Sequence, residues 1–183
     1  MITKETESRE EYLAETGKAM MAAARTAPKA CGIDNLEIAM VTGSKIGRLA
    51  AKMREVGESS GRAFFLRDAD NVDNSDAMVL IGAKPRVRKL NCGLCGFETC
   101  ALKESEAPAT PCSFDVMDLG IALGSAVSVA ADRRVDNRIM YSAGVAAGEL
   151  GMLDESTVII TIPLSTNGKS IYYDRKPNAS CAK

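Results

Sequence analysis

Apolar residues recur along this chain at two different intervals, which predicts both helices and strands. Ser8 and Glu11 have the spacing of a capping box, and apolar residues then follow at helical spacing toward Pro28. Proline disfavours helix at the residue before it, so this helix is expected to end near Arg25. Three more segments show helical spacing. They are residues 44–57, with Ser44 as cap and Gly57 as stop, 114–132, with Ser113 as cap, and 138–150.

Short apolar runs between these helices predict strands. Residues 77–83 are apolar almost throughout, so this strand is expected in the interior of a sheet. Other strands are expected at residues 36–42, 63–66, 157–162 and 171–173, and Pro163 is expected to end the third of these. Residues 67–75 are expected to form an acidic loop or a single helical turn. The segment 114–132 is apolar around most of its circumference and rich in small residues. It is therefore expected to be buried on nearly all sides.

Composition narrows the functional classes. The 183 residues suffice for one substantial core, and a net charge of −1 with 4% aromatic residues gives no indication of a nucleic-acid partner. The chain has no histidine, which excludes Ser-His and Cys-His catalytic pairs and histidine-ligated zinc hydrolases. The charged N-terminal residues do not form a signal peptide, and the low-charge run 116–131 is too short to span a bilayer. A cytoplasmic location without a membrane span is expected.

Four of the six cysteines lie close together among glycines, in the pattern Cys92-x2-Cys95-x4-Cys100-x11-Cys112. In a reducing compartment such clustered thiols indicate a soft-metal site, either a structural zinc or an iron–sulfur cluster. Zinc sites usually pair two short cysteine knuckles across a long spacer. Here three cysteines are close and the fourth follows alone, which favours a 4Fe-4S cluster. Cys31 is an alternative ligand if Cys112 cannot reach the site.

The run C-G-L-C-G-F-E-T-C at 92–100 resembles the small iron–sulfur domain of the corrinoid iron–sulfur protein and of Rnf-type electron-transport subunits. This resemblance implies a cluster loop inserted at residues 84–113. The whole chain resembles anaerobe proteins described as containing a ferredoxin domain. The blocks that carry this resemblance are A-R-T-A-P-K, the cysteine loop, D-L-G-I-A-L-G-S-A, D-N-R-I-M-Y-S and I-P-L-S-x-x-G-K-S-I-x-x-D-R.

The order of elements also resembles the nitroreductase family, with matching motifs at Ala27-Pro28-Lys29, at Asn35 and at residues 122–125. This resemblance implies one α+β domain over residues 1–183, a mixed sheet sandwiched with long buried helices, a homodimer, and FMN at the dimer interface. The family's arginine-rich phosphate motif is absent, and only Arg9 lies near its place. The implied FMN contacts are Arg25, Lys29 and Arg175 at the phosphate, Thr26 and Asn35 at the ring or ribityl chain, and Gly124 and Ser125 beneath the ring.

The leading hypothesis is a redox protein whose cluster relays single electrons to or from a bound flavin, with a ferredoxin or flavoprotein as redox partner. Two alternatives remain open. One is a flavin-free electron carrier or cluster-bearing subunit, and the other is a zinc-stapled interaction protein. No catalytic residue is assigned.

Overall fold

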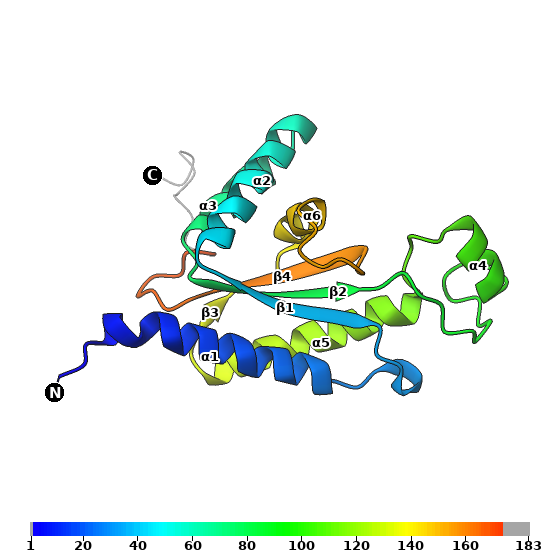
Figure 1. Ribbon diagram of the computed structural model, residues 1–183, viewed down its shortest axis with the longest axis horizontal. Coiled ribbons are helices and arrows are strands. Elements are labelled where there is room, and N and C mark those ends of the chain that lie inside the picture. The colour runs from blue at the N-terminus through cyan, green and yellow to red at the C-terminus, as the bar shows by residue number, and fades with distance from the viewer. Residues whose placement is uncertain (1, 174–183) are drawn as a thin grey trace, which may run out of the picture.

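The computed structural model describes residues 2–173 of the chain. Helices and strands alternate along it in an α+β arrangement (Figure 1). The helices are α1 (Glu5–Thr26), the 3-10 turn η1 (Ala30–Gly32), α2 (Ser44–Ser60), α3 (Ala63–Asp73), α4 (Cys100–Glu106), α5 (Ser113–Asp132) and α6 (Tyr141–Glu149). The strands are β1 (Leu36–Thr42), β2 (Ala77–Ala83), β3 (Asp136–Asn137) and β4 (Val158–Ser165).

The four strands form one sheet in the order β1-β2-β4-β3. All three strand pairs are antiparallel, with Leu36 opposite Ala83 in the first pair and Ala77 opposite Leu164 in the second. The expected α+β class is thus confirmed, although the described sheet is antiparallel where a mixed sheet was expected.

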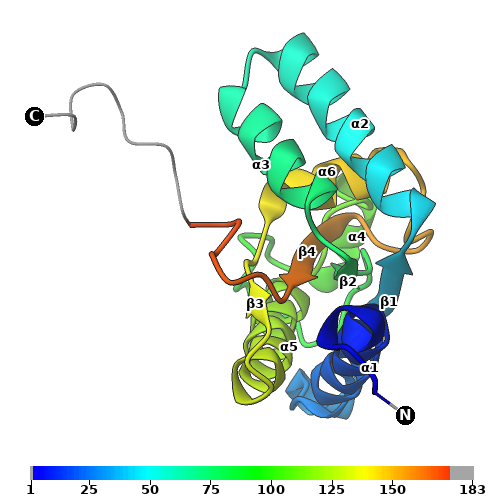
Figure 2. The same cartoon turned by 90° about the vertical axis from the view of Figure 1, so that its left-hand side faces the viewer.

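Strand β2 is buried along its whole length, as its continuous apolar run predicts. Successive side chains of a strand point to opposite faces, so β2 contributes to two separate cores. Val79 and Ile81 pack with α1 and α5, whereas Met78 and Leu80 pack with α2, α3 and α6. Figure 2 shows these two helical layers on opposite sides of the sheet.

The backbone of α6 lies directly on strand β4. A Cβ added at Gly144 would lie 1.8 Å from the carbonyl oxygen of Ile159, which no real side chain tolerates. Position 144 therefore requires glycine for a close approach between helix and strand.

The region between α2 and β2 differs from the sequence prediction. Helix α2 does not stop at Gly57 but continues to Ser60, and the left-handed Gly61 (φ 68°) caps it. Gly57 lies instead beneath α3, where a Cβ would lie 2.9 Å from the Cβ of Phe65. Residues 63–73 form one helix, α3, where a strand at 63–66 and then an acidic loop or a single helical turn were expected. The four-residue run at 63–66 was too short to distinguish the two periods, whereas the buried side chains of α3 recur at helical spacing.

Three predictions near the C-terminal end are wrong. Residues 171–173 form a turn, and α6 begins at Tyr141 rather than at residue 138. Strand β4 continues through Pro163 to Ser165. On the edge that faces β3, the described part of β4 is paired at Leu164 and Ser165 and through an isolated bridge at Thr161. Pro163 is not paired on that edge, so the backbone N–H that proline lacks is not needed there for a hydrogen bond between strands.

Helix α5 is buried on one side only, contrary to expectation. Val116, Met117 and Ile121 are 45–47% exposed, while Leu119, Ala122 and other residues of the opposite side pack against α1 and the sheet. With 20 residues, α5 is the one described helix long and apolar enough to cross a membrane. The prediction that the low-charge run 116–131 is too short to span a bilayer therefore does not apply to the whole helix. A helix packed in a protein core passes the same test of length and composition, and α5 is packed in this way on one side.

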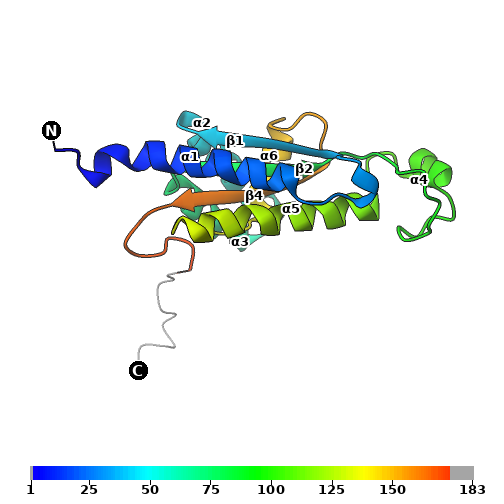
Figure 3. The ribbon, with the colours of Figure 1, turned by 90° about the horizontal axis from the view of Figure 1, so that it is seen from below.

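The segment between β2 and α5 projects beyond one end of the sheet (Figures 1 and 3). It contains α4, against which no other described helix or strand packs extensively. The segment is therefore joined to the body of the protein mainly through its two ends.

Candidate metal centre

The four cysteines of the motif line one small hollow in the projecting segment, together with Arg88, Leu90, Phe97 and their neighbours. Cys92 is exposed, Cys95 and Cys100 are partly buried, and Cys112 is buried. Cys31 lies in η1, is exposed, and is not among the residues that line this hollow. The fourth cysteine brought to the site is therefore Cys112.

The hollow has a volume of about 10 Å³, which is room for little more than one water molecule. Among the described residues, no group of three or more thiol or carboxylate side chains is placed to hold a single metal ion. A 4Fe-4S cluster is larger than this hollow, so the residues around it would have to rearrange to admit one. The donor set nevertheless suits one, because four thiolates are the usual ligands of a 4Fe-4S cluster.

The chain winds around the hollow through residues with left-handed backbone conformations. Asn91 (φ 49°), Gly93 (φ 69°) and Gly96 (φ 86°) all lie in this region. Asparagine is one of the few side chains other than glycine that adopt it readily. These turns bring successive cysteines toward the same point.

Asn91 and Cys100 hold each other across the hollow. The backbone N–H of Asn91 donates to the Cys100 sulfur at 3.4 Å, and the backbone N–H of Cys100 donates to the side-chain Oδ1 of Asn91 at 2.8 Å. Hydrogen bonds from the backbone to cysteine sulfur are one determinant of cluster reduction potential. Sequence analysis missed Asn91, although its place directly before the first cysteine was a usable signal.

Cys112 connects the hollow to the body of the protein. It is the N-cap of α5, where its carbonyl oxygen accepts from the amides of Asp115 at 2.9 Å and Val116 at 3.1 Å. The expected cap was Ser113, one residue later. The positive end of the α5 dipole therefore lies beside this cysteine.

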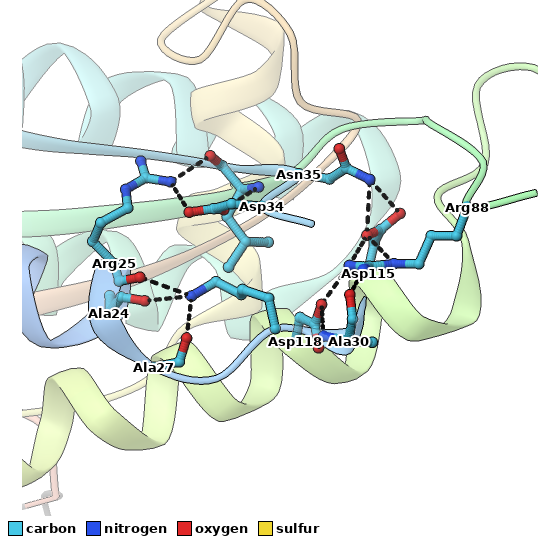
Figure 4. A network of polar contacts seen from close by, with 11 residues as sticks. Ala24, Arg25, Ala27, Ala30, Asp34, Asn35, Arg88, Asp115 and Asp118 are labelled. Carbon is cyan, nitrogen blue, oxygen red and sulfur yellow. Dashed lines mark hydrogen bonds and ion pairs between the residues drawn. The ribbon is translucent and has the colours of Figure 1, made fainter. Parts of the chain in front are cut away.

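A buried network of charged groups lies where the projecting segment meets the body (Figure 4). The Arg88 side chain is 1% exposed, and its Nε and Nη2 donate to Asp115 Oδ1 at 3.0 and 2.6 Å. Arg88 also donates to Asp118 and to the carbonyl of Ala30. The side-chain amide of Asn35 donates to Asp115 at 3.1 Å. The network thus joins η1, the residue before β1, and α5 to the start of the segment.

This network holds two carboxylates against one guanidinium. Burial raises the pKa of Asp115 above its ordinary value, and the hydrogen bonds from Asn35 and Arg88 offset part of that effect. Four of the six residues 84–89 are basic, and a run of this kind is usually exposed. Arg88 is instead a buried ion-pair partner of α5.

The cations assigned to a flavin phosphate contact their own chain. Arg25 pairs with Asp34 at 2.6 Å. The Lys29 Nζ donates to the carbonyls of Ala24, Arg25 and Ala27 at 2.6–3.1 Å and so closes the end of α1 (Figure 4). Lysine near the C-terminus of a helix commonly satisfies its last carbonyls in this way. Arg175 lies outside the described residues.

The remaining residues assigned to flavin are also engaged within the chain. The Thr26 hydroxyl donates to carbonyls of α1, and the Ser125 hydroxyl donates to the Ala23 carbonyl at 3.0 Å. Asn35 belongs to the buried network, while Gly124 is exposed on α5. The described residues of a single chain therefore do not present a cradle that fits FMN.

A larger cavity of about 550 Å³ lies away from the cysteines, beside the first half of α1. Tyr12, Arg133 and Thr166 are among its lining residues. Arg9, the residue near the place of the missing arginine-rich motif, also lines it and is paired with Glu5 at 2.7 Å.

Comparison with known sequences gives one relative and one family. A protein of Archaeoglobus fulgidus, described as an uncharacterized protein, is 45% identical over an alignment of 184 positions that covers 97% of this chain and 99% of the relative. The family described as "Uncharacterized protein containing a ferredoxin domain (DUF2148)" matches residues 108–175. That match includes Cys112 and all of α5.

Solved structures with a similar fold are nitroreductases. The FMN-dependent nitroreductase NfnB from Mycobacterium smegmatis, solved in complex with NADPH, has a TM-score of 0.58 at 12% identity, covering 91% of this chain and 84% of that protein. A nitroreductase with bound FMN from Desulfitobacterium hafniense has a TM-score of 0.57 at 13% identity, covering 92% and 85%.

The hypothetical oxidoreductase YcnD from Bacillus subtilis, with a TM-score of 0.51 at 15% identity, is longer. The alignment covers 90% of this chain and only 61% of YcnD. At these identities the likeness shows the fold alone, and it confirms the nitroreductase-like scaffold expected from the sequence.

Proposed function

This chain belongs to the family of uncharacterized proteins containing a ferredoxin domain, and we propose that it is an iron–sulfur electron-transfer protein of the oxidoreductase type. The observation that carries the proposal is the convergence of Cys92, Cys95, Cys100 and Cys112 on one hollow. A 4Fe-4S cluster held there by four thiolates would accept and release single electrons, with no open iron for a substrate.

The residues around the hollow are suited to holding such a centre. The amide of Asn91 donates to one ligand sulfur, and the N-terminal end of α5 lies at another, so both favour negative charge on sulfur. The site is close to the surface, because Cys92 is exposed and Leu94 is 56% exposed. A redox partner protein, such as a ferredoxin or a flavoprotein, would therefore dock at this end of the molecule.

Of the forms of this proposal with and without FMN, we favour the flavin-free carrier. Arg25, Lys29 and Asn35 are already satisfied by their own chain, and releasing them would break a salt bridge, a helix cap and a buried hydrogen bond. We therefore assign no step to a flavin.

We also propose that the protein is a homodimer formed through α5. Its exposed side carries Met117 and Ile121, each 47% exposed, and the small Gly120 and Gly124 next to them. Small residues allow two helices to approach closely, and large exposed apolar side chains on one helix face mark an interaction surface.

The test of the cluster is purification without oxygen, followed by a visible spectrum and analysis of iron, acid-labile sulfide and zinc. We expect about four irons and four sulfides per chain, the composition of the cluster class. Replacing Cys95 by serine should abolish the visible absorption, and the matched Cys31→Ser variant should keep it. A colourless protein with one zinc per chain would refute the proposal, whereas isoalloxazine bands in the spectrum would favour the flavin-containing form.

A further inference from the structure

Lys103 is the one buried residue between positions 89 and 110 of the projecting segment. It lies on α4 and is 1% exposed, while most of its neighbours are exposed. A small segment of this kind ordinarily buries an apolar side chain at its centre, because lysine is rarely fully buried unless it is paired.

The Lys103 ammonium has no hydrogen-bond partner among the described residues. No described carboxylate forms an ion pair with it either, and the buried carboxylates Asp115 and Asp118 are paired with Arg88. An unpaired buried charge is strongly unfavourable, so a group that is negatively charged is expected beside it. The four thiols of the same segment are the ligands of such a group.

Lys103 is not among the residues that line the hollow, but it lies on the helix that begins at one of these ligands. It follows Cys100 by three residues on α4, and residues at this spacing lie on the same side of a helix. Its ammonium can donate three hydrogen bonds and accepts none, which suits sulfur atoms with negative charge.

We infer that Lys103 is a positioning residue for the cluster, supplying the buried positive charge that balances it and raises its reduction potential. This inference rests on the proposed function. It predicts opposite effects of Lys103→Met in the two states of the protein. The metal-free segment should become more protected, because an unpaired buried charge is replaced by an apolar side chain of similar length. The cluster-bound protein should become harder to reduce, because reduction adds negative charge that is no longer balanced.

The experiment compares the wild type, Lys103→Met, Lys103→Arg and the control Lys45→Met after reconstitution with iron and sulfide without oxygen. Lys45 is exposed on α2, so its replacement changes the net charge equally, away from the site. The measurements are iron and sulfide per chain, the midpoint potential from a redox titration followed by electron paramagnetic resonance, and hydrogen exchange of α4 in the metal-free protein.

We expect Lys103→Met to lower the ratio of reduced to oxidised cluster at the wild-type midpoint at least tenfold, a shift of about 59 mV for a one-electron couple. Lys103→Arg and Lys45→Met should stay within twofold of the wild type. Slower exchange in metal-free Lys103→Met would support the inference further. A wild-type midpoint in Lys103→Met, or loss of the cluster from both the methionine and the arginine variants, would overturn it. A wild type that takes up no iron would instead refute the proposed function.

Discussion

Replacing Arg88 by methionine should be among the most damaging single changes in the body of this protein. The side chain is 1% exposed and is the buried cation that faces both Asp115 and Asp118. Its removal would leave two buried carboxylates close together without a countercharge. Breaking a buried ion pair in this way costs about 3–5 kcal/mol, mainly because of the charge that remains.

Urea unfolding followed by circular dichroism measures this loss. With a dependence on urea of roughly 2 kcal/mol per molar, a loss of about 3–5 kcal/mol lowers the midpoint by about 1.5–2.5 M. Asp115→Asn is the matched control, because the amide oxygen still accepts hydrogen bonds and Arg88 keeps one carboxylate, Asp118. Its cost should be about 1 kcal/mol. A midpoint shift below about 0.5 M in Arg88→Met would refute this account of the network.

The pH dependence of this loss has a definite sign. Burial already raises the pKa of Asp115, so the folded protein binds this proton more readily than the unfolded chain does. Protonation of Asp115 therefore contributes to the unfolding free energy. This contribution is fully present below the ordinary pKa of aspartate and is lost as the pH rises through the raised pKa of Asp115. Without the hydrogen bonds and charge of Arg88, the pKa of Asp115 should rise further. The deficit of Arg88→Met in unfolding free energy should therefore be smaller at pH 5 than at pH 7, and an equal deficit would contradict the charge argument.

Two further changes test other parts of the structure. Gly144→Ala should lower the unfolding free energy by about 1–3 kcal/mol in urea, because its Cβ would overlap the Ile159 carbonyl oxygen, whereas Gly47→Ala in the open side of α2 should raise it by about 0.5–1 kcal/mol. Equal effects of the two would contradict the close contact. Ile121→Lys should convert a dimer into monomers in analytical ultracentrifugation, while Phe64→Lys on α3, an equally large exposed apolar residue, should leave the dimer intact. A monomeric wild type would refute the dimer.

The sequence predicted the elements whose signal is local. Strand β2 was recognisable because every residue is apolar, and the start of α2 because Ser44 precedes a regular apolar stripe. The end of α2 was not recognisable in the sequence, because a glycine can either end a helix or let a neighbouring helix pack closely against it. Gly57 lets α3 pack closely, whereas Gly61 ends the helix, and only the packing of α3 distinguishes the two.

Only the metal ligands of the candidate site could be predicted from the sequence. The spacing of four cysteines indicates a soft-metal site, and the structure brings those four to one hollow. The partners of Arg88 could not be read from the sequence, because they lie 27 and 30 residues away in the chain and meet only when α5 packs on the body. Lys103 was missed for a similar reason. A lysine in a short polar helix is expected to be exposed, and nothing local indicates that this one is buried.

The buried network also bears on how the cysteines are brought together. Arg88 lies at the start of the projecting segment and lines its hollow, while Asp115 and Asp118 lie one to two turns after Cys112 on α5. The ion pairs therefore hold the two ends of the segment together in the folded protein, whether or not a cluster is bound. Closing a loop of this length costs conformational entropy. A cluster that binds to a segment whose ends are already held together does not have to offset this cost. The ion pairs of Arg88 would thus contribute to the affinity for the proposed cluster as well as to the stability of the body, so weakening them should reduce iron retention before it unfolds the chain.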